Sequence, residues 1–294
     1  MVRNLQTIKD IRLYLETELG DIYPPEEIKA LSNIVIGSVL GSGNRQRIYF
    51  SDTIADPEQQ SEIIRLCNGL KEGIPVQYLL GETVFCGCLI KLNRETLIPR
   101  PETEELVDLV IRENRNYKGN IIDFGTGSGC IAIALAVNLP GASVTGTDNS
   151  PGALRQAGEN AQLNNASISL VMDDMLELNP LFPAQPEFKA GIIVSNPPYV
   201  MLSEKKFMKR NVLDYEPHGA LFADDSEPLL FYKAILRRAE GILLPGGRIY
   251  FEINETQGSR MAELMRAQGY RETRVVSDIN GKDRIVKAIK DDTK

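Results

Sequence analysis

The feature that most constrains the fold is an alternation of short apolar runs with helix-like segments from Gly119 onward. Apolar runs predict strands at residues 121–124, 143–148, 168–172, 191–195, 248–253, 272–276 and 284–289. Helical segments fall between most of them, at residues 131–138, 152–164, 228–241 and 256–268. This pattern is typical of a parallel sheet covered on both faces, with ligands at the carboxyl ends of the strands. Since no helix separates the last two runs, we expect them to form an antiparallel pair at one edge.

The first eighty residues show helical periodicity instead. Apolar side chains recur at three- and four-residue steps, at Leu5, Ile8, Ile11, Leu15 and Leu19, at Ile28, Leu31, Val35 and Val39, and at Ile63, Cys67 and Leu70. Helix starts are indicated by Pro24-Pro25-Glu26-Glu27 and by Asp56 before Pro57. We expect a helical domain over residues 1–75, a β-hairpin linker over residues 76–100 and an α/β domain over residues 101–294.

Composition narrows the classes of function. The net charge of −7 argues against a protein that wraps bare nucleic acid, although Lys205, Lys206, Lys209 and Arg210 form a local basic strip typical of a solvated helix face. No run approaches the roughly 18 apolar residues that cross a bilayer, and residues 1–10 lack a signal pattern. We therefore expect a cytoplasmic protein with no membrane partner and no direct nucleic-acid binding.

The cysteines are scattered, and His218, the single histidine, is expected at the surface. Neither a disulfide framework nor a histidine-rich metal site is supported, so we predict no metal. Cys86 and Cys88 flank a glycine in what is predicted as a strand, and we expect both as buried or half-buried reduced thiols.

Residues 121–129 (IIDFGTGSG) form a strand that runs straight into a glycine-rich turn, followed by an apolar helix. Glycines are needed where a backbone turns sharply and a ligand approaches it closely. A nicotinamide-binding fingerprint requires G-x-G-x-x-G, whereas here the third glycine, Gly129, comes one residue early and Cys130 occupies the expected place. The predicted cofactor-binding turn is Gly125, Thr126, Gly127, Ser128 and Gly129.

Two further segments suit an adenosine group. Asp148 ends the next strand, where its carboxylate could accept hydrogen bonds from both ribose hydroxyls. Met175 follows the strand after that, where it could pack on an adenine ring, while the neighbouring Asp174 could reach the amino group of the ring.

The fourth predicted strand leads into Asn196-Pro197-Pro198-Tyr199. Methyl transfer is an in-line displacement, so an enzyme mainly has to desolvate and aim the nucleophile. The Asn196 side-chain oxygen and the Pro197 carbonyl could each accept a hydrogen bond from an NH₂ group. Consecutive prolines, each with φ near ~−65°, keep the loop rigid, and Tyr199 could pack on a planar amide or base. These four residues are the predicted catalytic and acceptor-binding residues, and Asn196 is also predicted to border the cofactor.

Such loops serve both adenine N6 methyltransferases and enzymes that methylate glutamine amides, so the motif alone leaves the acceptor open. The acidic charge disfavours the adenine alternative. A domain that binds S-adenosylmethionine without catalysis is disfavoured by the intact acceptor motif, and a nicotinamide-dependent oxidoreductase by the early Gly129.

Over nearly its whole length the sequence resembles the peptide chain release factor N(5)-glutamine methyltransferases. The matching segments are Pro75-Val76-Gln77-Tyr78-Leu79 with Gly81 and Phe85, residues 97–104 (LIPRPETE), residues 123–129, residues 196–199, and Tyr215-Glu216-Pro217 with Ala220-Leu221. The resemblance implies an α/β, Rossmann-like S-adenosylmethionine-dependent methyltransferase with a small N-terminal helical domain that recognises release factors, and a linking β-hairpin.

The resemblance also implies the substrate and the site. The acceptor would be the glutamine of the Gly-Gly-Gln motif of release factors, whose methylation modulates translation termination. The cofactor would be S-adenosyl-L-methionine, with S-adenosyl-L-homocysteine as product, bound by Gly125 to Gly129 and Asp148 with Met175 at the adenine. Residues 196–199 would hold the glutamine amide, and the segment that carries Arg100 and Glu102 would close over the cofactor and shape the acceptor channel. The family often carries an aromatic residue where Met175 stands, which puts the role of this residue in doubt.

Overall fold

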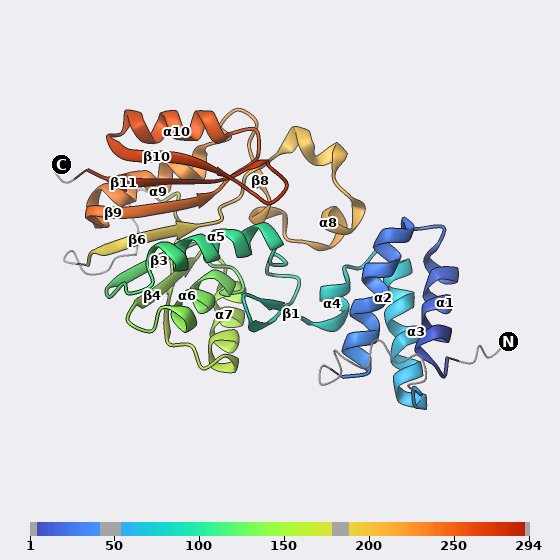
Figure 1. Ribbon diagram of the computed structural model, residues 1–294. Helices are drawn as coiled ribbons and strands as arrows, with labels where there is room; N and C mark the ends of the chain where they lie inside the picture. Colours follow the sequence, from blue (N-terminus) through green and yellow to red (C-terminus); the bar gives the residue numbers. More distant parts are fainter. Residues whose placement is uncertain (1–4, 42–53, 178–187, 292–294) are drawn as a thin grey trace. The chain divides into compact units, whose positions relative to one another are not determined.

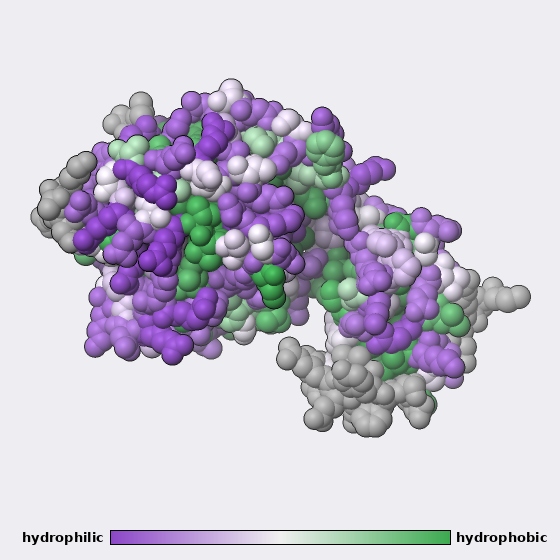
Figure 2. Space-filling view, turned by 45° about the horizontal axis from the view of Figure 1, so that its top comes forward, coloured by the Kyte–Doolittle hydropathy of each residue, from purple (hydrophilic) through white to green (hydrophobic). Residues whose placement is uncertain are grey.

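The computed structural model describes residues 5–41, 54–177 and 188–291 (Figure 1). Contacts divide the chain into two compact units, residues 1–81 with 209–215 and residues 82–208 with 216–294. Residues 1–4, part of the amino terminus searched for a signal, lie outside the described residues. In the described part of the chain, no helix has the length and apolar character needed to span a membrane. On the face seen in Figure 2 the surface is mainly hydrophilic, with apolar patches between the charged side chains.

The first unit is a helical bundle. Its helices are α1 (Ile8–Leu19), α2 (Pro25–Val39), α3 (Pro57–Lys71), α4 (Val76–Leu80) and α8 (Arg210–Tyr215). Thr7 and Asp56 cap α1 and α3 through capping boxes, and Pro25 begins α2. The predicted apolar faces form the core, with Ile11, Leu15 and Ile63 fully buried. The helices predicted from periodicity, α1, α2 and α3, are confirmed.

The segment predicted as short β-prone runs differs from the expectation at two places. Residues 76–80 form α4, which begins after Pro75 and ends at Gly81 in the left-handed conformation. Strands β1 (Glu82–Phe85) and β2 (Cys88–Lys91) then pair as an antiparallel hairpin. Cys86 and Gly87, with φ of 47° and 80°, form its two-residue turn, so the predicted hairpin is confirmed, while Cys86 lies in the turn and not in a strand. As expected, Cys86 is half-buried, Cys88 is buried and both thiols are free.

The second unit contains a seven-stranded sheet in its described residues, ordered β10-β11-β9-β6-β3-β4-β5. The strands are β3 (Asn120–Phe124), β4 (Ser143–Asp148), β5 (Ile168–Met172), β6 (Ala190–Ser195), β9 (Leu243–Glu252), β10 (Tyr270–Ser277) and β11 (Asp283–Lys290). Five strands are parallel to one another, namely β5, β4, β3, β6 and β9. Strands β10 and β11 form the antiparallel edge pair that was expected. Strand β9 begins five residues earlier than the predicted 248–253. The α/β fold class is confirmed.

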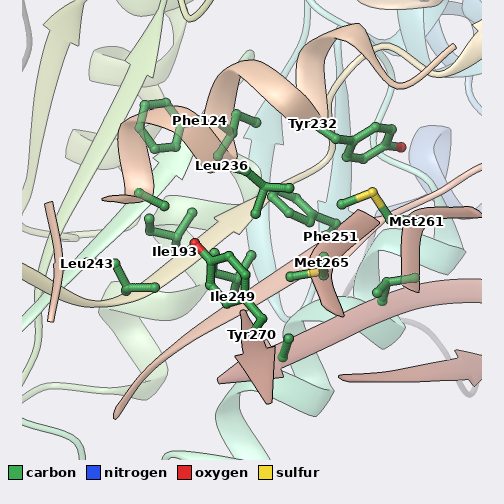
Figure 3. Close-up of a cluster of buried hydrophobic side chains, with 14 of the residues drawn as sticks. Phe124, Ile193, Tyr232, Leu236, Leu243, Ile249, Phe251, Met261, Met265 and Tyr270 are labelled. Carbon is green, nitrogen blue, oxygen red and sulfur yellow. The ribbon is translucent and has the colours of Figure 1, made fainter. Parts of the chain in front are cut away.

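Helices cover both faces of this sheet. The larger core lies between the sheet and helices α9 (Leu230–Ile242) and α10 (Gly258–Ala267), where Tyr232 meets Phe251 edge-on with ring centroids 5.3 Å apart (Figure 3). Helices α5 (Pro101–Glu113), α6 (Cys130–Asn138) and α7 (Pro151–Leu163) pack beside one another on the other face (Figure 1). Since alternate side chains of a strand point to opposite faces, Ile122 and Phe124 enter the core and Asp123 faces the other way.

The chain after the acceptor motif does not form the single basic helix face predicted for Lys205 to Arg210. Strand β7 (Val200–Met201), which pairs with β8 (Phe222–Ala223), leads into the 3₁₀ helix η3 (Leu202–Phe207). Lys205 and Lys206 lie in η3, whereas Lys209 belongs to the helical unit and forms an ion pair with Glu27 at 2.7 Å. A second 3₁₀ helix, η4 (His218–Ala220), carries His218, which is exposed as expected.

Candidate active site

A cavity of about 490 Å³ lies in the second unit at the carboxyl ends of β3, β4, β5 and β6. The chain order reverses beside β3, because β4 and β5 lie on one side of it and β6 on the other. Such a switch point is where open α/β sheets bind ligands, and the volume suits a nucleoside-sized molecule. The lining residues are Glu95, Thr96, Leu97, Gly125, Gly127, Asp148, Asn149, Ser150, Ala153, Asp173, Asp174, Met175, Leu176, Asn196, Pro198, Pro217, Gly219, Ala220 and Phe231.

The glycine-rich turn forms one wall of the cavity. Gly127 has φ of 54°, and a Cβ at this position would meet no atom within 4 Å, so the backbone lies open to a ligand. Gly129, with φ of 80°, is required for packing, since a Cβ there would lie 3.0 Å from the Cβ of Ala157 on α7. The early third glycine therefore brings α6 and α7 close together.

Two backbone hydrogen bonds fix the carboxylate of Asp148 beside the glycine-rich turn. Its Oδ2 accepts a hydrogen bond from the Gly127 amide and its Oδ1 one from the Ser150 amide, both at 2.9 Å. Burial raises the pKa of the Asp148 carboxyl, while these backbone hydrogen bonds lower it. Each carboxylate oxygen keeps a further lone pair, so Asp148 can accept hydrogen bonds from the vicinal hydroxyls of a ribose.

The loop after β5 forms the opposite wall. Asp174 and half-buried Met175 line the cavity, and Met175 approaches Gly125, where an added Cβ would lie 3.2 Å from its methyl group. Asp173 is buried and forms an ion pair with Arg238 of α9, which also donates to the Asp174 carbonyl. An apolar thioether beside a carboxylate suits an adenine ring with its amino group. Together with the open Gly127 and the carboxylate of Asp148, these residues fit S-adenosylmethionine.

The acceptor loop follows β6 and borders the same cavity through Asn196 and Pro198. The Asn196 Nδ2 donates to Thr103 Oγ1 at 3.1 Å, and Thr103 donates in turn to Glu252 Oε2 at 2.7 Å. The Tyr199 hydroxyl donates to Glu252 Oε1 at 2.9 Å, and burial raises the pKa of Tyr199. The loop is thus held from behind by a buried carboxylate.

The structure brings most, but not all, of the predicted site residues to the cavity. Of the predicted cofactor residues, Thr126, Ser128 and Gly129 do not line it; the Thr126 hydroxyl is buried and donates to Asp123 Oδ2 at 2.6 Å. Of the predicted acceptor residues, Asn196 and Pro198 line the cavity, and Pro197 and Tyr199 are not among its lining residues.

Arg100 and Glu102 also lie outside the lining. Arg100 forms an ion pair with Glu216, with 2.5 Å between Nη2 and Oε1. The Glu216 side chain is 1% exposed, and its Oε2 also accepts a hydrogen bond from the Ile98 amide at 3.2 Å. Glu216 thereby ties the segment before α5 to the segment around Pro217, and both segments contribute lining residues.

Some functional candidates escaped the sequence analysis. Glu252 and Arg238 were not singled out, although Glu252 is a charged residue in the apolar run at residues 249–253, and buried charged residues are usually paired. Arg238 lies between Arg237 and Glu240 in sequence and gives no such signal. Phe231 and Asn149 also line the cavity. Their positions carry no local signal, because only the pairing of distant strands and helices brings them there.

Fold and cavity together define the class as a Rossmann-like, S-adenosylmethionine-dependent methyltransferase. The Methyltransferase small domain family matches residues 103–215. The catalytic domain of hMettl16, in complex with a 3'UTR hairpin, aligns with a TM-score of 0.55 at 17% identity, covering 84% of this chain and 86% of that one. A methyltransferase from Pyrococcus furiosus aligns with a TM-score of 0.50 at 16% identity, covering 80% and 100%. At these identities the likeness concerns the fold alone.

Sequence relatives define the family more narrowly. The chain is 42% identical to the release factor glutamine methyltransferase of Bacteroides thetaiotaomicron, with 95% of this chain and 98% of that one covered. It is 41% identical, with the same coverage, to the protein of that name from Flavobacterium psychrophilum. The chain belongs to the release factor glutamine methyltransferase family. The predicted family, enzyme class and cofactor are thereby confirmed.

Proposed function

We propose that this chain transfers the methyl group of S-adenosylmethionine to the side-chain amide nitrogen of the glutamine in the Gly-Gly-Gln motif of peptide chain release factors, and that this modulates translation termination. The observation that carries the proposal is that Asn196 borders the same cavity as Gly127 and Asp148. An acceptor-binding side chain and the cofactor-binding residues are thus adjacent in a protein of this family.

Each predicted residue has a specific part in this proposal. The backbone of Gly125 to Gly129 receives the amino acid portion of the cofactor, Asp148 binds the ribose, and Asp174 and Met175 border the adenine. Bound S-adenosylmethionine supplies a methyl carbon activated by its positive sulfur. Asn196 Oδ1 and the Pro197 carbonyl accept hydrogen bonds from the two N–H bonds of the glutamine amide, which orients the nitrogen and increases its electron density.

The reaction needs precise placement more than acid–base chemistry. An amide nitrogen is a weak nucleophile because its lone pair is delocalised into the carbonyl, so exclusion of water and alignment with the methyl carbon matter most. Pro197 and Pro198 hold the acceptor loop rigid, and Tyr199 packs against the planar amide. Bound S-adenosylmethionine would supply its methyl group to the amide nitrogen and leave as S-adenosyl-L-homocysteine, and the nitrogen would release one proton to water.

Replacing Asn196 by Ala removes one acceptor of the glutamine N–H bonds. We expect kcat to fall by about 10²-fold or more, while the Kd of S-adenosylmethionine stays within a few-fold, since the other cofactor contacts remain. Steady-state kinetics with a release factor and calorimetric titration of the cofactor measure the two effects. Asn138→Ala, at the exposed end of α6, is the matched control.

The outcome of the Asn196 experiment separates two roles. Loss of cofactor binding in Asn196→Ala would move this residue from the acceptor to the cofactor site. The acceptor class is tested by incubating the protein with labelled S-adenosylmethionine and a mixture of release factor, DNA and RNA. The proposal requires label on the release factor, and label on a nucleic-acid adenine would support the adenine methyltransferase instead.

A further inference from the structure

One buried carboxylate has no part in the mechanism above. Glu252 ends β9 and is 0% exposed, yet both of its carboxylate oxygens are used. Oε1 accepts from the Tyr199 hydroxyl, and Oε2 accepts from the Thr103 hydroxyl of the first turn of α5. A buried charge is costly and adds little net stability compared with an apolar side chain of similar size. Its position directly behind the acceptor loop therefore suggests a role in arranging that loop.

The hydrogen bonds in this network have a defined direction. Both carboxylate oxygens of Glu252 accept hydrogen bonds, and the single hydroxyl proton of Thr103 is donated to Oε2. The Thr103 oxygen can then only accept from its remaining neighbour, Asn196. The NH₂ group of Asn196 consequently faces Thr103, and its amide oxygen is left for the cavity that Asn196 lines.

We infer that Glu252 is a positioning residue that, through Thr103, sets which end of the Asn196 amide faces the acceptor, and that also holds Tyr199 by its hydroxyl. The inference rests on the proposed function, because it requires that Asn196 bind the acceptor through its oxygen. A reversed amide would present NH₂ to the NH₂ of the substrate, which are two donors facing each other. The carboxylate thus selects the orientation that can accept a hydrogen bond from the acceptor.

The packing around Glu252 limits other arrangements. The Tyr232 hydroxyl donates to the Glu252 backbone carbonyl at 2.8 Å, which fixes the end of β9 against α9. Thr103 is 2% exposed, so water does not readily replace it as the partner of Asn196. Burial raises the pKa of Glu252, whereas its hydrogen bonds from Thr103 and Tyr199 and the charge of Arg284, whose side chain is 12% exposed, lower it.

Glu252→Gln tests the inference with little change of shape. A glutamine amide has one accepting and one donating end, so either Thr103 or Tyr199 loses its acceptor. We expect kcat for release factor methylation to fall by about 10- to 100-fold, with the Kd of S-adenosylmethionine within a few-fold of wild type. Glu263→Gln, exposed on α10, is the matched control and should retain wild-type kcat.

Thr103 provides an independent test that leaves the carboxylate in place. Thr103→Val interrupts the relay and should lower kcat like Glu252→Gln, whereas Thr103→Ser keeps the hydroxyl and should restore most of the activity. Thr273→Val on β10 is the control for the Thr-to-Val change. This serine rescue separates a role of the hydroxyl from a loss of packing, and it applies even if Glu252→Gln does not fold.

The outcomes distinguish failure of the inference from failure of the proposed function. If Asn196→Ala is inactive while folded Glu252→Gln and Thr103→Val keep wild-type kcat, the relay is overturned and the acceptor role of Asn196 stands. If Asn196→Ala keeps wild-type kcat, both are overturned. In an Asn196→Ala background, Thr103→Val should cause no further fall in kcat, and a full additional loss would contradict action through Asn196.

Discussion

Asp123 is the penultimate residue of β3, just before the cofactor turn, and it is 0% exposed. The Thr126 hydroxyl donates to its Oδ2 at 2.6 Å. Burial raises the pKa of Asp123 to about 7, far above the value near ~3.9 of an unfolded chain. The folded chain therefore keeps this proton up to about pH 7, whereas the unfolded chain loses it near ~pH 4.

This difference predicts a pH dependence of stability. The contribution of Asp123 to the free energy of unfolding is greatest below the pKa that this residue has in the unfolded chain. It decreases as the pH rises toward the folded-state pKa of about 7, by about 1.4 kcal/mol per pH unit. Asp123→Asn removes the titrating group, so its free energy of unfolding should decline less than that of wild type between about pH 5 and about pH 7. Denaturant unfolding across this range measures the difference. Equal slopes in wild type and Asp123→Asn, or the same change in the exposed control Asp21→Asn, would contradict the account.

At the scale of single residues, the sequence predicts functional residues that stand in a recognisable motif at the end of a strand. Gly127, Asp148 and Asn196 were recognised because each lies at a strand end in a motif with a chemical purpose. Glu252 and Thr103 were not, because their importance depends on hydrogen bonds between distant positions, and the bond that joins these two residues spans 149 positions of the sequence. Arg100 was expected to bind the substrate, and its contact with Glu216 likewise depends on a distant segment.

At the scale of elements, α9 is joined to the loop after β5 by the buried pair Arg238–Asp173. Arg238→Met would remove the ion-pair partner of the buried Asp173 carboxylate, which should lower the free energy of unfolding by about 3–5 kcal/mol. Because Arg238 also donates to the Asp174 carbonyl, the loop should loosen and the Kd of S-adenosylmethionine should rise several-fold. Thermal unfolding and calorimetric titration measure the two changes.

The neighbouring Arg237 is exposed, so Arg237→Met is the matched control and should leave both quantities near wild type. Combining Arg238→Met with Asp173→Asn also removes the buried negative charge and should recover part of the free energy of unfolding. If Arg238→Met binds the cofactor as tightly as wild type, the arrangement of the loop after β5 does not depend on its contacts with Arg238 of α9.

Helices and strands were predictable from the sequence where the apolar residues followed a single clear pattern. The strands at 143–148 and 168–172 have the expected bounds, because each is a short run rich in β-branched or apolar residues between turn residues. The segment at residues 76–80 was misjudged, because a five-residue helix is too short to show a helical period. The early start of β9 at Leu243 was missed because Pro245, Gly246 and Gly247 are typical turn residues.

At the scale of the whole molecule, we propose that the helical unit recognises the release factor while the α/β unit carries out the transfer. A short peptide that contains Gly-Gly-Gln would then lack the contacts of the helical unit. We expect a full-length release factor to have a KM at least tenfold below that of the peptide, with kcat changed much less. Steady-state kinetics with the two substrates measure this ratio. Equal KM values would assign recognition to the α/β unit alone.

The division into a helical and an α/β unit followed from the change of hydrophobic period along the chain. The inclusion of residues 209–215 in the helical unit did not, because this segment lies between two parts of the α/β unit in sequence. Its place depends on long-range contacts such as the Tyr215 hydroxyl donating to the Glu72 carbonyl at 3.0 Å, which a local pattern does not encode.

The central claim is that the glutamine side-chain nitrogen of the Gly-Gly-Gln motif is the atom methylated. The most direct test is fragmentation mass spectrometry of a release factor after incubation with this protein and S-adenosylmethionine. The account predicts one added methyl group on that glutamine side chain, and none when Asn196→Ala replaces the wild-type protein. A methyl group on another residue of the release factor, or an unmodified Gly-Gly-Gln glutamine, would contradict it.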